Sequence, residues 1–266
     1  HSNLAVHESL QSCMQEVVMR LGAGAHRMGG AAQVTLFVWN TPMFQTWYQH
    51  LVNAGNRLDG ARVLSHLSFG NPANPFVFYY ALHVNIWVES EQRHKSNEIL
   101  VARPDTSAVV AVSKDRNRVV LVREFRSPAN NALGMIYEFP AGSCSDEGIA
   151  MDINAQHELH EETGLLVQEM ARFHRVSCRQ LAATFSTHQA HLYAIELTDE
   201  ELTQLDKSKD TAFGDAAAGG SQERTYVEVL SMDEFYALPV DYSTIGMYHE
   251  ALRVLAMVQC SDDSTL

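Results

Sequence analysis

The sequence predicts an α+β protein in which a mixed sheet has helices on either face and a β-rich region comes before that sheet. Two observations support this fold class. Apolar segments of strand length recur along the chain, and from residue 99 onward they alternate with two well-separated segments of helical periodicity. Hydrophobic residues make up 46% of the 266 residues and charged residues 19%, which is typical of a globular chain rather than a disordered one.

Composition excludes several classes of protein. The formal net charge of −13 disfavours a protein that wraps duplex nucleic acid, because an acidic chain repels phosphate backbones, but it suits a protein that binds divalent cations. The most apolar stretch, Pro75 to Val88, is too short to span a membrane, so we expect no membrane partner. The cysteines show no zinc-pair spacing and are interpreted as reduced thiols of an intracellular protein, in the cytoplasm or in an organelle such as the mitochondrion.

Residues 1–98 are predicted to form the first domain, an N-terminal helix followed by a β-rich region. Proline is tolerated in the first helical turn, so Thr41-Pro42 predicts a helix start, and Phe44, Trp47, Tyr48 and Leu51 follow at helical spacing. The expected elements are a helix over Glu8 to Leu21, a strand over Val34 to Trp39, the helix from Pro42, strands over Ala61 to Phe69 and Phe76 to Glu89, and a hairpin tip over Ser90 to Glu98.

Residues 99–262 are predicted to form the second domain, which contains most of the strands. A central helix should end near Thr163-Gly164, because glycine is favoured just after a helix. The expected elements are strands over Ser107 to Ser113, Arg118 to Phe125 and Ile136 to Phe139, a helix over Ile149 to Glu162, strands near Phe173 to Ser177 and His191 to Leu197, a mobile loop over Lys207 to Gln222, a strand over Thr225 to Leu230, and a helix over Ser243 to Val258.

The central helix carries a set of acidic residues. Glu158, Glu161 and Glu162 stand at positions i, i+3 and i+4, so we expect one helix face to present three carboxylates. Ala155 and Leu159 lie on another stripe and are expected to pack inward. Three like charges repel one another, and a hard divalent cation reverses the sign of that interaction. A solvated acidic face is the competing interpretation.

This stretch resembles the Nudix box, which is Gly, five residues, Glu, seven residues, and then Arg-Glu-apolar-any-Glu-Glu-any-Gly-apolar. The segment Glu158-Leu-His-Glu-Glu-Thr-Gly-Leu165 matches every specified position after the Arg. Gly142 matches the start, with one extra residue before Asp146. His157 stands at the box Arg, which helps to orient the neighbouring Glu in the family, and Ile149 stands at the first Glu, so the box is divergent.

The surrounding sequence resembles the ADP-ribose and ADP-sugar pyrophosphatase branch of that family. The similar segments are Val119 to Pro128 and Tyr137 to Gly142, with a weaker likeness upstream. The resemblance implies a Nudix α/β/α sandwich, a homodimer, and Mg²⁺ or Mn²⁺ as the cofactor. By the same resemblance, the metal ligands would be Glu158, Glu161, Glu162 and the carbonyl of Ala141.

The resemblance also implies residues for substrate binding and catalysis. Arg126 matches an Arg that holds substrate phosphate, with a strand-end salt bridge as the alternative, and Arg103 is a weaker candidate. Glu138 either supports the site or pairs with Arg123 or Arg126. Three candidates for the catalytic base stay open: His188, which takes an acidic position of the family or is a surface residue, Glu161, and Glu223 from the mobile loop. His191 is interpreted as structural.

Two functions compete at this point. The first is metal-dependent hydrolysis of the diphosphate bond in a nucleoside diphosphate linked to another moiety, such as ADP-ribose, an ADP-sugar or a similar NDP-sugar, which gives a nucleoside monophosphate and a phosphorylated product. The alternative is an RNA 5′-end pyrophosphohydrolase or a protein that binds RNA 5′ phosphates. The acidic balance disfavours RNA, and no stripe of Lys and Arg with interleaved aromatic residues is evident. The N-terminal region is expected to serve dimerisation or substrate recognition.

Overall fold

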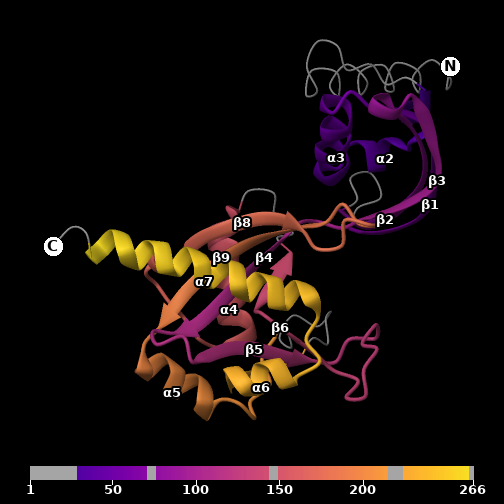
Figure 1. Ribbon diagram of the computed structural model, residues 1–266. Coiled ribbons are helices and arrows are strands. Elements are labelled where there is room, and N and C mark those ends of the chain that lie inside the picture. The colour runs from indigo at the N-terminus through magenta and orange to yellow at the C-terminus, as the bar shows by residue number, and fades with distance from the viewer. Residues whose placement is uncertain (1–28, 71–75, 144–148, 215–223, 264–266) are drawn as a thin grey trace. The chain divides into compact units, whose positions relative to one another are not determined.

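The computed structural model describes residues 29–70, 76–143, 149–214 and 224–263 (Figure 1). These residues divide into two compact units. The N-terminal unit is His1–Pro104 together with Ala182–His188, and the C-terminal unit is Asp105–Leu181 together with Gln189–Leu266. The boundary expected between residues 98 and 99 falls inside strand β3 (Arg93–Ala102). The helix expected over Glu8 to Leu21 lies outside the described residues.

The N-terminal unit contains an antiparallel sheet in the order β1-β2-β3, formed by β1 (Arg57–Phe69), β2 (Phe76–Val88) and β3. Short helices come before it: η1 (Gly29–Gln33), α2 (Leu36–Trp39) and α3 (Pro42–Asn53). The predicted start of α3 is confirmed, because Thr41 is the N-cap and its side chain accepts a hydrogen bond from the Phe44 N–H at 3.2 Å.

Two predictions for this unit are wrong. The strand expected over Val34 to Trp39 is instead the short helix α2, in which the Asn40 N–H donates to the Leu36 carbonyl at 2.9 Å. A short apolar run fits a buried helix turn as well as a strand. The hairpin tip is also shorter than expected. It consists of η2 (Glu89–Glu91) and Gln92, whose φ of 51° reverses the chain, and β3 begins at the next residue.

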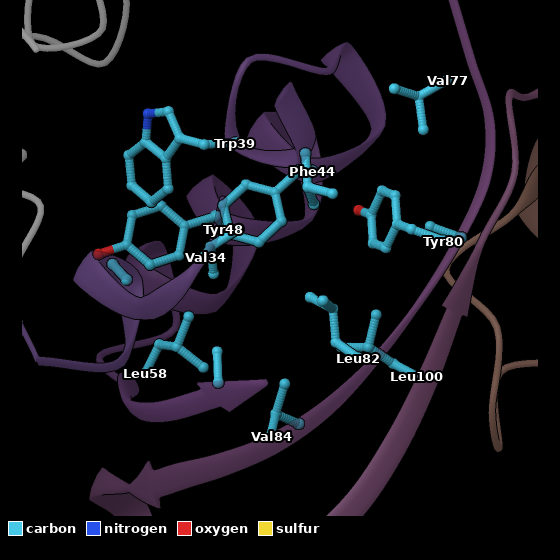
Figure 2. Close-up of a cluster of buried hydrophobic side chains, with 14 residues drawn as sticks. Val34, Trp39, Phe44, Tyr48, Leu58, Val77, Tyr80, Leu82, Val84 and Leu100 are labelled. Atoms are coloured by element: carbon cyan, nitrogen blue, oxygen red, sulfur yellow. The ribbon is translucent and has the colours of Figure 1, made fainter. Parts of the chain in front are cut away.

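Aromatic side chains fill the core of the N-terminal unit (Figure 2). The rings of Phe44 and Tyr48 stack at 5.8 Å, and the ring of Trp39 lies 5.1 Å from each of them. Tyr80 from β2 approaches the same cluster, at 6.4 Å from Phe44. Its hydroxyl is enclosed, and burial raises its pKa well above the ordinary tyrosine value. The aromatic stripe of α3 therefore faces the sheet, although Trp47 is only partly buried.

The C-terminal unit contains a mixed sheet in the order β10-β5-β4-β9-β8, with β6 added to β5 and β7 added to β4. β4 runs parallel to β9 and antiparallel to β5 and β7. The strands are β4 (Thr106–Ser113), β5 (Arg118–Glu124), β6 (Ile136–Glu138), β7 (Ala141–Ser143), β8 (His174–Gln180), β9 (Gln189–Leu197) and β10 (Thr225–Ser231).

Helices cover both faces of this sheet. Alternate residues of β4 point to opposite sides, so Val109 and Ala111 pack with α4 (Met151–Thr163) and α5 (Asp199–Lys207). Val110 packs on the other side with α6 (Met232–Ala237) and α7 (Tyr242–Asp263), which crosses the sheet in Figure 1. A short η3 (Met170–Arg172) precedes β8. The mixed α+β fold, with its antiparallel N-terminal sheet, is the predicted class.

Helices α5 and α6 are additions to the predicted elements. Each begins with a capping box, formed by Thr198 with Glu201 and by Ser231 with Glu234. Those two sequence signals predict a helix start, although each helix is short. No helix in the described part of the chain is long and apolar enough to cross a membrane.

Candidate functional site

Helix α4 is held in place by apolar packing and by its C-terminal cap. Ala155 and Leu159 are fully buried against the sheet, as their spacing predicted. The helix ends at Gly164, which has a φ of 71° and donates its N–H to the His160 carbonyl at 2.8 Å. A Cβ at Gly164 would overlap the ring of Phe213, so both the backbone conformation and the close packing require glycine here.

Two of the three predicted carboxylates lie against strand β7. Glu162 is only 4% exposed, and its Oε2 accepts a hydrogen bond from the Ala141 N–H at 2.9 Å. A Cβ added at Gly142 would overlap the Glu158 carboxylate, so this carboxylate occupies the space that a larger residue would fill. The turn of α4 from Glu158 to Glu162 and the backbone of β7 therefore meet directly.

The third carboxylate diverges from the other two. Glu161 is exposed, although its backbone carbonyl accepts a hydrogen bond from the Gly214 N–H at 3.2 Å. Residues one apart on an α-helix are rotated by about 100°, so Glu161 and Glu162 cannot both point at β7. Among the residues that the structure describes, no three His, Cys, Asp or Glu side chains come close enough together to hold a metal ion.

The donor chemistry fits a hard divalent cation. Glu158 and Glu162 supply carboxylate oxygens beside β7, and the backbone of Ala141 is at the same place. Mg²⁺ prefers oxygen ligands, is usually held by one or two carboxylates, and keeps several waters. These residues therefore suit Mg²⁺ or Mn²⁺ better than a metal that needs nitrogen or sulfur ligands.

The asparagine side chain of α4 that lies one turn before Glu158 was not anticipated from the sequence. Asn154 is 5% exposed, and its Nδ2 donates to the Ser107 Oγ at 2.6 Å and to the Gly142 carbonyl at 3.0 Å. These bonds join α4 to β4 and β7. The sequence did contain a signal for this role, because Asn154 is a polar residue among the inward-facing positions of the helix, and a buried polar side chain needs a hydrogen-bond partner.

Arg126 and Glu138 lie in the same unit as the acidic helix. The Arg126 Nε forms an ion pair with Glu124 Oε2 at 2.8 Å, and the arginine side chain is 45% exposed. Glu124 is buried at the end of β5 and was not singled out from the sequence. Glu138 is half-buried on β6, opposite Val122, while Arg123 pairs with Glu228 at 2.7 Å.

Two further candidates belong to the N-terminal unit and are described by their surroundings there. Arg103 and His188 belong to the N-terminal unit: the Arg103 guanidinium lies 5.3 Å from the Phe78 ring centre, and the His188 N–H donates to the Ser186 Oγ at 3.2 Å. His188 is 8% exposed, so the interpretation as a surface histidine is wrong. Glu223 lies outside the described residues. His191 on β9 lies 3.6 Å from the Cys178 Sγ and 3.8 Å from Asp105.

A comparison with protein families decides what kind of domain contains this site. Residues 102–217, less than half of the chain, match the family model described as the NUDIX domain. Residues 102–217 form a NUDIX domain. The domain includes β7, α4 and all three predicted glutamates, and it indicates a pyrophosphohydrolase with a nucleotide-type substrate that typically needs a divalent cation. No curated protein matches the chain significantly.

Proposed function

We propose that this protein hydrolyses the diphosphate bond of a nucleoside diphosphate linked to another moiety, such as ADP-ribose or an ADP-sugar, with Mg²⁺ or Mn²⁺. The products would be a nucleoside monophosphate and a phosphorylated second product. The observation that supports this proposal is the meeting of the Glu158 and Glu162 carboxylates with the backbone of β7 inside a NUDIX domain.

Glu158, Glu162, the Ala141 carbonyl and the exposed Glu161 would hold the cation. A bound Mg²⁺ supplies charge neutralisation for the diphosphate and favours deprotonation of a coordinated water. The Ala141 N–H donates to one oxygen of Glu162 and so helps to hold that carboxylate beside β7. Holding ligands in place before binding is the usual contribution of a protein to phosphoryl transfer.

In this proposal Glu161 also acts as the general base and Arg126 binds substrate. Glu161 is exposed on the side of α4 next to Glu162, where it can accept the proton of the attacking water; His188 and Glu223 remain the alternative bases. Arg126 would bind a substrate phosphate, because its guanidinium is partly exposed and one nitrogen is already oriented by Glu124. Arg103 and Glu138 are proposed to support substrate binding.

A substrate panel tests the proposal directly. The purified chain would be assayed with Mg²⁺ against ADP-ribose, ADP-glucose, UDP-glucose, GDP-mannose and 5′-triphosphate RNA. We expect hydrolysis of a nucleoside diphosphate linked to a sugar, and cleavage of RNA alone would overturn the proposed substrate class. Release of the nucleoside monophosphate identifies which anhydride bond is broken.

A charge-removing double variant tests the site. Glu161→Gln with Glu162→Gln should abolish turnover with the fold retained, because a glutamine oxygen at position 162 can still accept the Ala141 N–H. Glu169→Gln is the matched control, since Glu169 has a side chain that is 69% exposed and lies outside the acidic turn. Full activity of the double variant would refute the site assignment.

We also propose that the N-terminal unit serves dimerisation or substrate recognition. Strand β1 exposes several large apolar side chains, with Leu64 42%, Leu67 46% and Phe69 56% exposed. Sedimentation velocity over a range of concentrations measures the oligomeric state. A chain that stays monomeric at all concentrations would contradict the dimer and leave substrate recognition as the role to test.

A further inference from the structure

We infer that Asn154 is a positioning residue: its buried side-chain amide fixes β7 to α4 and thereby sets the place of the Glu158 and Glu162 carboxylates. This inference rests on the proposed function for its catalytic consequence. The geometric part of it stands on the contacts of the C-terminal unit alone.

Asn154 lies on the same side of α4 as the Glu158 and Glu162 carboxylates. Asn154 comes four residues before Glu158 and eight before Glu162, so the three side chains lie in one row along the helix. Asn154 and Glu162 are 5% and 4% exposed, respectively. The row therefore faces the protein interior at both ends and meets β7 along its length.

The side-chain amide of Asn154 donates two hydrogen bonds. Asn154 Nδ2 donates to the Gly142 carbonyl at 3.0 Å and to the Ser107 Oγ at 2.6 Å. Ser107 and Gly142 face each other in the β4–β7 ladder. One side chain thus links the helix to two adjacent strands at a single register position.

The strand held by Asn154, β7, also contacts the two carboxylates. Gly142 is the residue whose missing Cβ leaves room for the Glu158 carboxylate, and Ala141, its neighbour, donates its N–H to Glu162. A displacement of Gly142 relative to α4 would therefore disturb both acidic side chains together. His157, which stands at the Arg position of the box, is exposed. The side chain of α4 that donates a hydrogen bond to the Gly142 carbonyl of β7 is that of Asn154.

Asn154→Ala tests the inference with two readouts that do not depend on turnover. The first is the exchange rate of the Ala141 amide proton in metal-free protein, measured by NMR, which we expect to rise about tenfold because β7 loses a tether to α4. The second is binding of Mn²⁺ followed by the electron paramagnetic resonance signal of the free ion. We expect binding to weaken by about 10-fold to 100-fold, as is usual when a residue that orients ligands is removed.

Gln156→Ala is the matched control on the same helix. The Gln156 side-chain amide also donates to a backbone carbonyl, at 2.6 Å, but that carbonyl belongs to Val167 and not to β7. We expect this variant to leave both Ala141 exchange and Mn²⁺ binding within about twofold of the wild-type values. Equal effects of the two substitutions on both readouts would overturn the inference, because they would indicate general loosening of α4.

Ser107→Ala decides the question if Asn154→Ala does not fold. This variant removes only the second acceptor of Asn154 and leaves the bond to Gly142, so we expect a smaller rise in Ala141 exchange, about threefold. An unchanged exchange rate in Ser107→Ala would then count against the inference.

The readouts also separate the inference from the proposed function. A wild-type chain that neither binds Mn²⁺ nor cleaves any substrate would overturn the proposed function, while the exchange comparison would still test the positioning. A wild-type chain that is active, with Ala141 exchange equally fast in Asn154→Ala and Gln156→Ala, would overturn the positioning alone.

Discussion

The two sheets of this protein differ in how many of their faces are covered by the residues that the structure describes. In the C-terminal unit, every residue of β4 is buried, because helices pack on both sides of that strand. In the N-terminal unit, β1 buries Leu58 and Ala61 but leaves Leu64 and Leu67 exposed, because the aromatic core formed by the described residues packs on one face of the sheet. Burial on both faces produces a rigid layer on which α4 can be placed accurately, and burial on one face leaves a surface available for another role.

The comparison predicts, first, a large difference between apolar truncations. Leu121→Ala on β5 removes a fully buried side chain and should lower the free energy of unfolding of the C-terminal unit by about 2–5 kcal/mol. Leu67→Ala on β1, where the side chain is 46% exposed, should change the stability of the N-terminal unit by no more than about 0.5 kcal/mol.

Urea titration can measure these two effects separately. The three tryptophans, Trp39, Trp47 and Trp87, all belong to the N-terminal unit, so tryptophan fluorescence follows that unit, while far-UV circular dichroism follows the whole chain. A large effect of Leu67→Ala on the fluorescence transition would show that this face of β1 is covered in solution, which would break the comparison.

The second prediction concerns one glycine in each unit that lies very close to another residue, Gly30 in the N-terminal unit and Gly142 in the C-terminal unit. A Cβ at Gly30 would overlap the backbone of Gly60, which cannot move aside, so Gly30→Ala should destabilise the N-terminal unit by about 1–3 kcal/mol. The atoms nearest to a Cβ at Gly142 would be those at the flexible end of the Glu158 side chain. Gly142→Ala should therefore change stability by less than about 1 kcal/mol while weakening Mn²⁺ binding and hydrolysis. Urea titration and Mn²⁺ titration of both variants distinguish these outcomes; unchanged Mn²⁺ binding in Gly142→Ala would count against Glu158 as a ligand.

The third prediction is a pH dependence. A bidentate hydrogen bond from Arg172 is the largest cause that lowers the pKa of Glu201, followed on the lowering side by the Thr198 N–H. A lowered folded-state pKa stabilises the fold above the ordinary glutamate pKa, and this contribution is lost as the pH falls through the folded-state value. Arg172→Met should therefore cost about 1–2 kcal/mol at neutral pH and less at an acidic pH below the ordinary glutamate pKa.

The ion pair of the N-terminal unit gives the contrast for this measurement. Arg57 lowers the pKa of Asp59 through a similar bidentate hydrogen bond, but the arginine side chain is 63% exposed. Solvent screens such a pair, so Arg57→Met should have no resolvable effect on the fluorescence transition at either pH. A pH-independent cost of Arg172→Met would mean that its aliphatic packing, rather than its charge, stabilises the fold.

The smallest expected effect is a stabilisation. Gly246 lies inside α7, is exposed, and has no heavy atom near the position of an added Cβ. Gly246→Ala should raise the free energy of unfolding of the C-terminal unit by about 0.5–1 kcal/mol, because alanine loses less conformational freedom in a helix. A thermal unfolding curve measures the change, and a loss of stability would indicate that this face of α7 is covered by another part of the protein or a second copy.

The prediction of elements from the sequence was most successful where a periodic pattern is long. The predicted helix over Ile149 to Glu162 corresponds to α4, and the expected strand over Ser107 to Ser113 corresponds to β4. It failed over Val34 to Trp39, because a mostly apolar run of six residues contains too little periodicity to separate a helix from a strand. Elements α5 and α6 were missed because they are short, although their capping boxes are visible in the sequence.

By itself, the sequence determined the α+β class, the acidic turn of α4 and its glycine stop, because these depend on local spacing and backbone preference. Only the tertiary structure decided that Glu158 and Glu162 meet β7 while Glu161 is exposed, and that Asn154 joins α4 to Gly142. Those contacts join residues more than ten positions apart. They depend on how the helix is rotated against the sheet, which is set by the packing of Ala155 and Leu159 and not by the local sequence.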